Sequence, residues 1–295
     1  MNALQILSSP WAIVPDKLFE IQEIYSTHLR GEKADIESIE ARTGKPLQND
    51  RKPYQVENGM AIIPIHGVIA KRMNMFSQIS GGVSTQILGD DIRSALENTD
   101  IKGIILDVDS PGGTVDGTAE LGQLIYKNRG VKPILAYTDG MIASAAYWIA
   151  SAADQIFISG ATTMVGSIGV VASHVDYSEY EKQKGIKTTE VYAGKYKRIA
   201  SEHEPLSKEG QESIQERVDY LYSIFVDVIA KHRATTTNDV VNRMADGKIF
   251  IGQQAVNAGL VDGFTTFDEL LNSVVPAMSA ATERENYFSK IERRL

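Results

Sequence analysis

From residue 60 onward the chain alternates between short, continuously apolar segments and amphipathic segments of about 10 to 15 residues. A continuously apolar segment is typical of a parallel strand covered on both faces, whereas an amphipathic segment suits a helix packed on a sheet. The alternation therefore predicts an α/β fold with a mainly parallel sheet flanked by helices. The expected strands lie within residues 60–70, 101–109, 132–139 and 155–159, and the expected helices within 86–98, 117–130 and 142–153.

The sequence on either side of this pattern has a different character. After Pro15 one helical pattern places Leu18, Ile21, Tyr25 and Leu29 on a single face, and a polar stretch with glycine and proline follows. The last 20 or so residues are charged and are typical of a solvated tail. The expected organisation is an N-terminal helical arm and linker over residues 1–57, a main domain over 58–275 and a charged C-terminal tail over 276–295.

A long amphipathic helix is expected over residues 207–233. Ser207 is placed to be its N-cap residue, because a serine oxygen can accept a hydrogen bond from the first helical turn. The apolar stripe of this helix could pack within the chain or form a contact between subunits, and both interpretations stay open. The stripe consists of Ile214, Val218, Leu221, Phe225 and Val228.

Composition limits the chemistry that is open to the chain. The sequence has no cysteine, so disulfides, thiolate metal sites and cysteine nucleophiles are excluded. A net charge of -8 and a pI near 5.3 argue against a dedicated nucleic-acid surface. The five histidines lack the paired spacing of metal ligands, and no nucleotide-binding fingerprint is present, so we expect neither a metal nor a cofactor.

Nothing in the sequence indicates export or a membrane anchor. The N-terminus lacks a basic region, and its apolar stretch is broken at residues 8–10. The longest apolar-looking run, residues 140–153, is too short and too rich in alanine to span a bilayer. We therefore expect a soluble, cytoplasmic protein.

Two glycine-containing turns follow predicted strands, at the edge of the sheet where α/β proteins bind ligands. The first, Asp109-Ser110-Pro111-Gly112-Gly113, is either a plain turn or a means of presenting bare backbone N–H groups to an anion. The second leads from Asp139-Gly140 into Ser144, which is either a nucleophile near a helix start or a small packing residue. If the two strand ends are adjacent, the Gly113 and Ala145 N–H groups form an oxyanion hole beside Ser144.

A serine nucleophile needs a base to accept its proton. None of the five histidines stands in a recognisable Ser/His/Asp context. A lysine can serve instead, provided that burial lowers the pKa of its amine so that it is partly neutral near pH 7. Lys195 and Lys197 follow residues 188–194, which are predicted to form a strand, and these residues alone do not distinguish between the two lysines.

Five motifs in one order resemble the signal peptide peptidase A family of Ser-Lys serine peptidases. They are Asp109–Gly113, Asp139–Tyr147, Met164–Val170, Gly194–Lys197 and Gly247–Asp262, and the resemblance covers about residues 58 to 275. It implies a fold related to Clp protease and crotonase. It also implies roles for single residues: Ser144 as nucleophile, Lys197 rather than Lys195 as base, Gly113 and Ala145 as oxyanion donors, and Ser167 as the residue that holds the lysine amine.

The resemblance further implies a polypeptide substrate and a ring-shaped homo-oligomer whose sites face an enclosed space. The N-terminal segment is similar to the phage and prophage branch of the family, whose members process head or scaffold proteins during capsid assembly, in the host cytoplasm or the prohead. Three alternatives remain: a cytoplasmic peptidase that degrades signal-peptide remnants or oligopeptides, a crotonase-like acyl-CoA enzyme, and a non-catalytic assembly protein.

Overall fold

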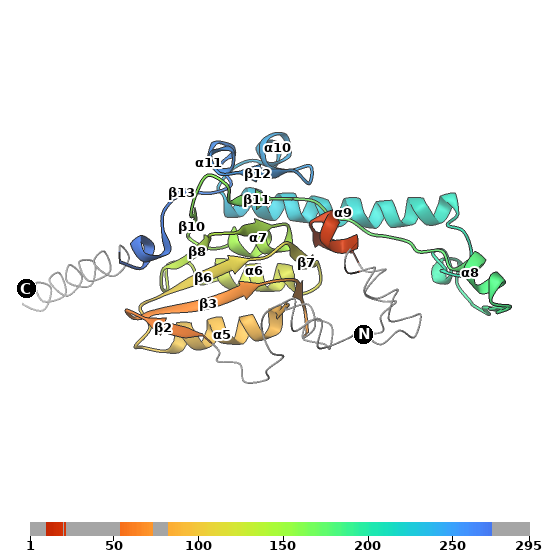
Figure 1. The fold of residues 1–295 in the computed structure, drawn as a ribbon, viewed down its shortest axis with the longest axis horizontal. Coiled ribbons are helices and arrows are strands. Elements are labelled where there is room, and N and C mark those ends of the chain that lie inside the picture. Colours follow the sequence, from red (N-terminus) through yellow and green to blue (C-terminus); the bar gives the residue numbers. More distant parts are fainter. Residues whose placement is uncertain (1–9, 20, 22–53, 73–81, 273–295) are drawn as a thin grey trace, which may run out of the picture.

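A six-stranded sheet forms the centre of the computed structural model, which describes residues 10–19, 21, 54–72 and 82–272 (Figure 1). Neighbouring strands are parallel except at one edge, where β2 runs antiparallel to β3. The strand order is β13-β10-β8-β6-β3-β2, with β2 at Gln55–Glu57, β3 at Met60–His66, β6 at Gly103–Asp109, β8 at Ile134–Thr138, β10 at Gln155–Ile158 and β13 at Gly263–Phe264. The predicted α/β fold with a mainly parallel sheet is confirmed.

Two smaller sheets continue from the central one, because β4, β7, β9 and β11 each follow a central strand in the chain. One has the order β1-β7-β4-β5, with β1 at Trp11–Ile13, β4 at Ile69–Ala70, β5 at Val83–Ser84 and β7 at Gly112–Thr114. The other has the order β12-β11-β9, with β9 at Met141–Ala143, β11 at Met164–Gly166 and β12 at Ile249–Ile251. Two strands that precede residue 58, β1 and β2, thus belong to sheets of the main domain.

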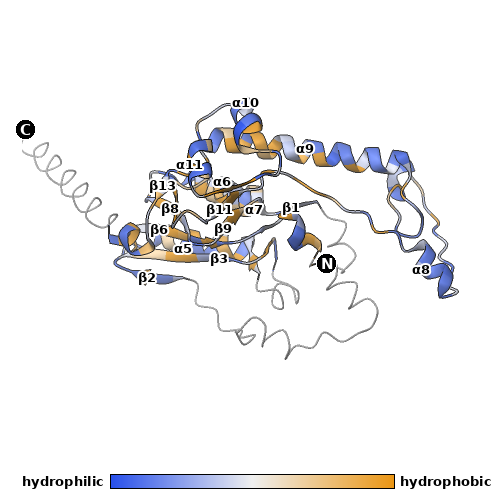
Figure 2. Cartoon of the chain, turned by 45° about the horizontal axis from the view of Figure 1, so that its top comes forward, coloured by the Kyte–Doolittle hydropathy of each residue, from blue (hydrophilic) through white to orange (hydrophobic). Residues whose placement is uncertain are grey.

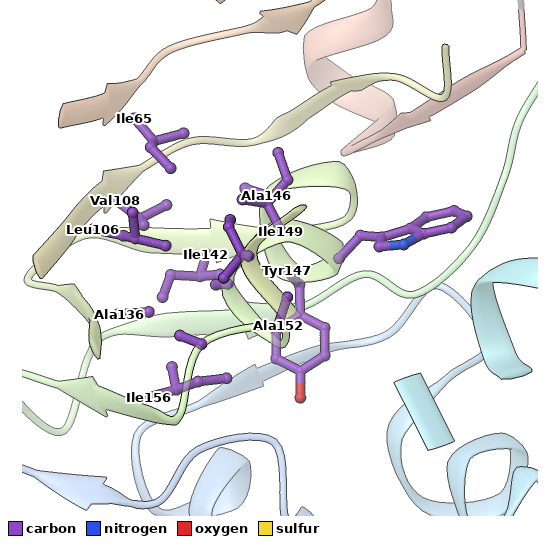
Figure 3. Close-up of a cluster of buried hydrophobic side chains, with 14 of the residues drawn as sticks. Ile65, Leu106, Val108, Ala136, Ile142, Ala146, Tyr147, Ile149, Ala152 and Ile156 are labelled. Carbon is purple, nitrogen blue, oxygen red and sulfur yellow. The ribbon is translucent and has the colours of Figure 1, made fainter. Parts of the chain in front are cut away.

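Three helices cover one face of the central sheet: α5 at Thr85–Glu97, α6 at Thr118–Lys127 and α7 at Ala145–Ala150. Alternate residues of β6, including Leu106 and Val108, point toward this helical layer, and α7 contributes Tyr147 to the same cluster (Figure 3). The opposite face includes Ile105 and is covered in part by Leu270. The helix expected over residues 142–153 begins only at Ala145, because the residues before it pair with β11 as strand β9.

The long helix α9, Lys208–His232, begins at the predicted N-cap residue. The Ser207 Oγ accepts a hydrogen bond from the Gly210 N–H at 3.0 Å. In the C-terminal half of α9, the Phe225 ring stacks on Trp148 of α7 at 4.4 Å between centroids. The N-terminal half extends beyond the central sheet toward α8, Ser178–Gln183, and polar residues predominate along this extension (Figures 1 and 2).

The prediction of a strand over residues 188–194 is wrong. This segment is irregular and exposed, and within the described part of the chain it pairs with no strand. The threonine, valine and tyrosine residues of the segment favour a strand, but such a preference acts only where a neighbouring strand and a buried face exist. Here the Val191 side chain is 96% exposed, so neither condition is met.

The remaining described elements are short. They are the 3-10 helix η1 at Lys195–Lys197, α10 at Thr237–Asp239, the π-helical turn η2 at Val240–Met244 and α11 at Gln253–Ala258. The expected positions of Tyr25, Leu29 and the tail 276–295 lie outside the described residues. Among the helices that can be described, none has both the length and the apolar character needed to cross a bilayer.

A buried histidine joins three of the helices. His232, the last residue of α9, has its Nδ1 2.9 Å from the Ser151 Oγ at the end of α7 and stacks on Tyr126 of α6 at 4.6 Å between centroids. Arg129 donates to three carbonyl oxygens at the same end of α7. Burial, with a contribution from the positive charge of Arg129, lowers the pKa of His232 to about 4.

Acidification should therefore weaken the fold through His232. Its pKa is 6.5 without these surroundings, so between pH 6.5 and about 4 the unfolded chain binds a proton that the folded chain does not. The stability that His232 contributes above pH 6.5 should be lost as the pH falls, by up to ~3 kcal/mol. Urea unfolding at pH 7 and pH 4.5 measures this loss, and a His232→Phe variant, which cannot take up the proton, should lose less. Equal losses of stability in the wild type and in the variant would contradict the attribution of the loss to His232.

Candidate active site

The two glycine-containing turns lie side by side in the structure. Ser110, immediately after β6, forms a parallel bridge with Ile142 in β9. The Ser110 N–H donates to the Met141 carbonyl oxygen at 2.9 Å, and the Ala143 N–H donates to the Ser110 carbonyl oxygen at 3.1 Å. These bonds hold the first turn next to Ser144, which is the adjacency that the sequence predicts.

Ser144 occupies a sharp turn between β9 and α7. Its φ of 54° and ψ of -116° are values that a residue with a side chain adopts only when its surroundings enforce them. The side chain is fully buried, and its Oγ has no hydrogen-bond partner among the residues that the structure describes. A strained turn from strand to helix is also how α/β-hydrolases present a nucleophilic serine. The hydroxyl thus has no structural partner here, and its placement fits a nucleophile.

The first turn lies close to Ser144 at Gly112, where the positive φ and the neighbouring atoms favour glycine. Gly112 has a φ of 104°, and a Cβ at this position would lie 3.0 Å from the Ser144 Cβ. Ser110 holds the turn in place, because its Oγ donates to the Gly67 carbonyl oxygen at 2.6 Å and accepts from the Gly112 N–H at 3.2 Å. The structural role of Ser110 was not expected from the sequence.

Each of the two predicted oxyanion donors directly follows Gly112 or Ser144 in the chain. Gly113 follows Gly112 in β7, and Ala145 is the first residue of α7. Backbone N–H groups in the first turn of a helix have no partner within that helix, so the Ala145 N–H is suited to bind a negatively charged oxygen. Both donors are backbone groups of buried residues, which is the environment in which such an interaction is strongest.

Ser167 lies at the corresponding position on the neighbouring strand. Strand β11 runs parallel to β9 with Gly166 opposite Ala143, and the Ser144 N–H donates to the Gly166 carbonyl oxygen at 2.7 Å. Ser167 therefore follows β11 as Ser144 follows β9, and it too has a positive φ, 53°. It is 4% exposed. The structure brings Ser144 and Ser167 together at the ends of two paired strands.

Lys197 is not among the residues brought together at this site. It ends η1, its side chain is exposed, and it lines a cavity of about 900 Å³ between η1 and the N-terminal half of α9. Ser144 does not line this cavity. The site of a single chain thus contains the serine and the predicted backbone donors, while the predicted base lies on the extension formed with α9.

Lys195 differs from Lys197 in its partners. Its amine forms an ion pair with the Glu209 carboxylate near the start of α9. The hydrogen bond and the charge of Glu209 raise the pKa of Lys195. A base must be neutral to accept a proton, so this pairing disfavours Lys195 in that role.

A family model and several known proteins are similar to this chain. A family model described as peptidase family S49 matches residues 127–279. Head-tail preconnector protein GP5 of Enterobacteria phage P21 is 28% identical over 83% of this chain and 49% of that protein. Capsid assembly protease C of Escherichia phage lambda is 28% identical over 79% of this chain and 52% of that protein. Protease 4 of Haemophilus influenzae is 29% identical over 74% of this chain and 35% of that protein.

The chain spans about half the length of the two phage proteins that it matches. The family match covers slightly more than half of the chain and includes the segments that carry Ser144, Ser167 and Lys197. The segments that carry Ser144 and Ser167 form the strained serine turn and its paired neighbour in the structure. The chain therefore belongs to peptidase family S49, a family of serine-type peptidases.

Proposed function

We propose that the chain is a serine endopeptidase that uses a Ser144–Lys197 dyad to cleave flexible polypeptides during the assembly of a phage head. The observation that supports the proposal is the state of Ser144, whose buried hydroxyl has no partner among the described residues and stands on a strained turn beside Gly112. A crotonase-like acyl-CoA enzyme would need the donors but not this hydroxyl. A non-catalytic assembly protein would need neither.

In the proposed reaction, the Ser144 Oγ attacks the carbonyl carbon of a peptide bond while its proton passes to the neutral Lys197 amine. The Gly113 and Ala145 N–H groups bind the oxyanion that forms. The protonated amine then gives its proton to the leaving nitrogen, and the acyl group stays on Ser144. Water, deprotonated by the same amine, releases the acyl group and restores the hydroxyl.

The position of Lys197 on the extension suggests how the dyad is completed. We place the base of one subunit at the Ser144 of a neighbouring subunit, within a homo-oligomer. An exposed lysine on an outlying extension can reach a second copy of the chain, and an identical contact repeated around a ring satisfies every site. Burial in that contact would also supply the desolvation that a neutral lysine requires.

The proposed substrates are flexible capsid or scaffold segments, processed in the host cytoplasm or in the prohead. Support comes from the names of two relatives, a head-tail preconnector protein and a capsid assembly protease. Degradation of signal-peptide remnants or oligopeptides is the second candidate, because Protease 4 of Haemophilus influenzae is also a relative. The two candidate functions differ in their substrates and share the same chemistry at Ser144.

Labelling and substrate choice test the proposal together. A fluorophosphonate should modify the full-length chain at Ser144 alone, located by mass spectrometry of peptides. The protein should cleave unfolded casein and leave a compact folded protein intact, because an extended strand must enter the site. Modification elsewhere, or no modification at any site, would exclude the serine peptidase mechanism. Efficient cleavage of the folded protein would exclude the restriction to flexible segments.

A further inference from the structure

Strand β1 lies in a slot between two segments that belong to the site. On one side it pairs antiparallel with β7, in the register Trp11 opposite Thr114, Ala12 opposite Gly113 and Ile13 opposite Gly112. On the other side Trp11 exchanges two backbone hydrogen bonds with Val171, both of 2.8 Å. β7 carries the oxyanion donor Gly113, and Val171 lies four residues after Ser167. A segment from near the N-terminus is therefore bound as a strand between the two walls of the site.

The register brings the Ala12 carbonyl to the proposed oxyanion donor. Val14 donates to the Pro111 carbonyl oxygen at 2.9 Å and Val115 donates to the Pro10 carbonyl oxygen at 3.4 Å. Hydrogen-bonded pairs alternate along an antiparallel ladder, so the pair midway between these two, Ala12 and Gly113, is also hydrogen-bonded. The Gly113 N–H is thus directed at the Ala12 carbonyl oxygen.

Ala12 is also close to the proposed nucleophile. A Cβ on Gly112 would clash with the Ala12 carbonyl oxygen, and the same Cβ would lie 3.0 Å from the Ser144 Cβ. The Ala12 carbonyl oxygen and the Ser144 Cβ therefore lie close to each other. A carbonyl beside a serine nucleophile, aligned with an oxyanion donor, is the geometry that a peptide substrate must adopt.

Side-chain packing holds β1 in the slot. Trp11, Ala12 and Ile13 are 1%, 0% and 3% exposed, and Trp11 and Ile13 form a small apolar cluster with Leu18 and the partly buried Val171. The residue that faces the site, Ala12, is small, whereas its neighbours on both sides are large. The slot therefore accommodates an extended chain whose residue next to Ser144 has a small side chain.

We propose that this slot is the strand-addition site for the polypeptide substrate and that β1 fills it as an intramolecular competitor. The inference rests on the proposed function, because it takes Ser144 and Gly113 as parts of the reaction site. A substrate can add its strand to β7 only when β1 has left, so its apparent affinity is the intrinsic affinity multiplied by the fraction of chains whose slot is empty. The substrate class is an extended segment that places alanine or a residue of similar size at the position of Ala12.

Two variants of the full-length chain test the competition. Ala12→Pro removes the N–H that bonds to Gly113, and Trp11→Ala removes the apolar anchor of β1. Each variant should cleave an unfolded peptide with a kcat/KM about tenfold or more above that of the wild type, through a lower KM. Phe19→Ala is the matched control, because it alters the exposed side of the same segment and should leave the kinetics unchanged.

A synthetic peptide of residues 10–16 extends the test. Added to the Ala12→Pro variant, it should raise the KM for the reporter peptide without changing kcat, and a peptide with proline in place of Ala12 should have no such effect. A variant that keeps the wild-type unfolding midpoint but shows unchanged or lower kcat/KM overturns the inference, as does an absence of competition by the peptide.

Fluorophosphonate labelling separates this inference from the function on which it rests. If Ser144 is labelled at the same rate in the wild type and in both variants, the peptidase proposal stands and the competitor role of β1 is rejected. If neither the wild type nor the variants are labelled, the proposed function itself fails. Faster labelling of both variants than of the wild type supports the competition.

Discussion

Replacing Ser144 by alanine is expected to lower kcat/KM for peptide cleavage by ~10⁴-fold or more, because no other group can form the acyl intermediate. Replacing Lys197 by alanine should have an effect of the same order, since the serine proton then has no acceptor. The Ser144 Oγ has no hydrogen-bond partner to lose among the described residues, and the Lys197 side chain is exposed, so neither change should unfold the chain. Cleavage of a fluorogenic peptide measures the loss, and circular dichroism verifies the fold.

Lys195→Ala is the matched control for Lys197→Ala. The two lysines belong to the same short helix, and Lys195 is paired with Glu209 on the surface. Its removal should leave activity within a few-fold of the wild type, because an exposed ion pair contributes little. The opposite result, an inactive Lys195→Ala variant and an active Lys197→Ala variant, would show that Lys195 and not Lys197 is the base.

The second large effect is a recovery of activity on mixing. If the dyad is completed between subunits, two inactive proteins, Ser144→Ala and Lys197→Ala, should form active sites when their subunits are exchanged. Random assembly in a ring should yield about a quarter of the wild-type activity, because one site in four receives an intact serine and an intact lysine. The proteins would be denatured together, refolded and assayed, with each variant refolded alone as the control.

A mixture that stays inactive would place both residues of the dyad within one chain. Such a result, with both single variants inactive, would require the extension that carries Lys197 to fold back on the Ser144 of its own chain. Light scattering then gives a second check, because a monomer with full activity would exclude a dyad between subunits.

The sequence predicted the elements whose side chains are buried within the chain. The strands β3, β6, β8 and β10 and the helices α5 and α6 were expected from apolar periodicity, which records burial directly. Ser207 was a reliable N-cap signal, because a cap depends only on the first helical turn. The segment 188–194 was misjudged for the opposite reason: its strand-forming residues lack a partner and a buried face.

The site was predictable in part. The adjacency of the Gly112-Gly113 turn and Ser144 follows from neighbouring strand ends, and the structure shows it. The positive φ of Ser144 and Ser167 leaves no trace in residue type, because both are serines in an otherwise ordinary apolar context. The position of Lys197 depends on how the extension beside α9 is directed, which no local pattern encodes.

The strained turns at Ser144 and Ser167 determine how the protein responds to random mutation. Each positive φ costs of the order of 1–3 kcal/mol and persists only because the surrounding packing enforces it. That packing includes distant contacts, such as the Trp148 ring on Phe225 and Arg129 at the far end of α7. Substitutions there are expected to relax the turn before they unfold the chain, so a library of variants should contain well-folded proteins that have lost catalysis through changes far from the nucleophile.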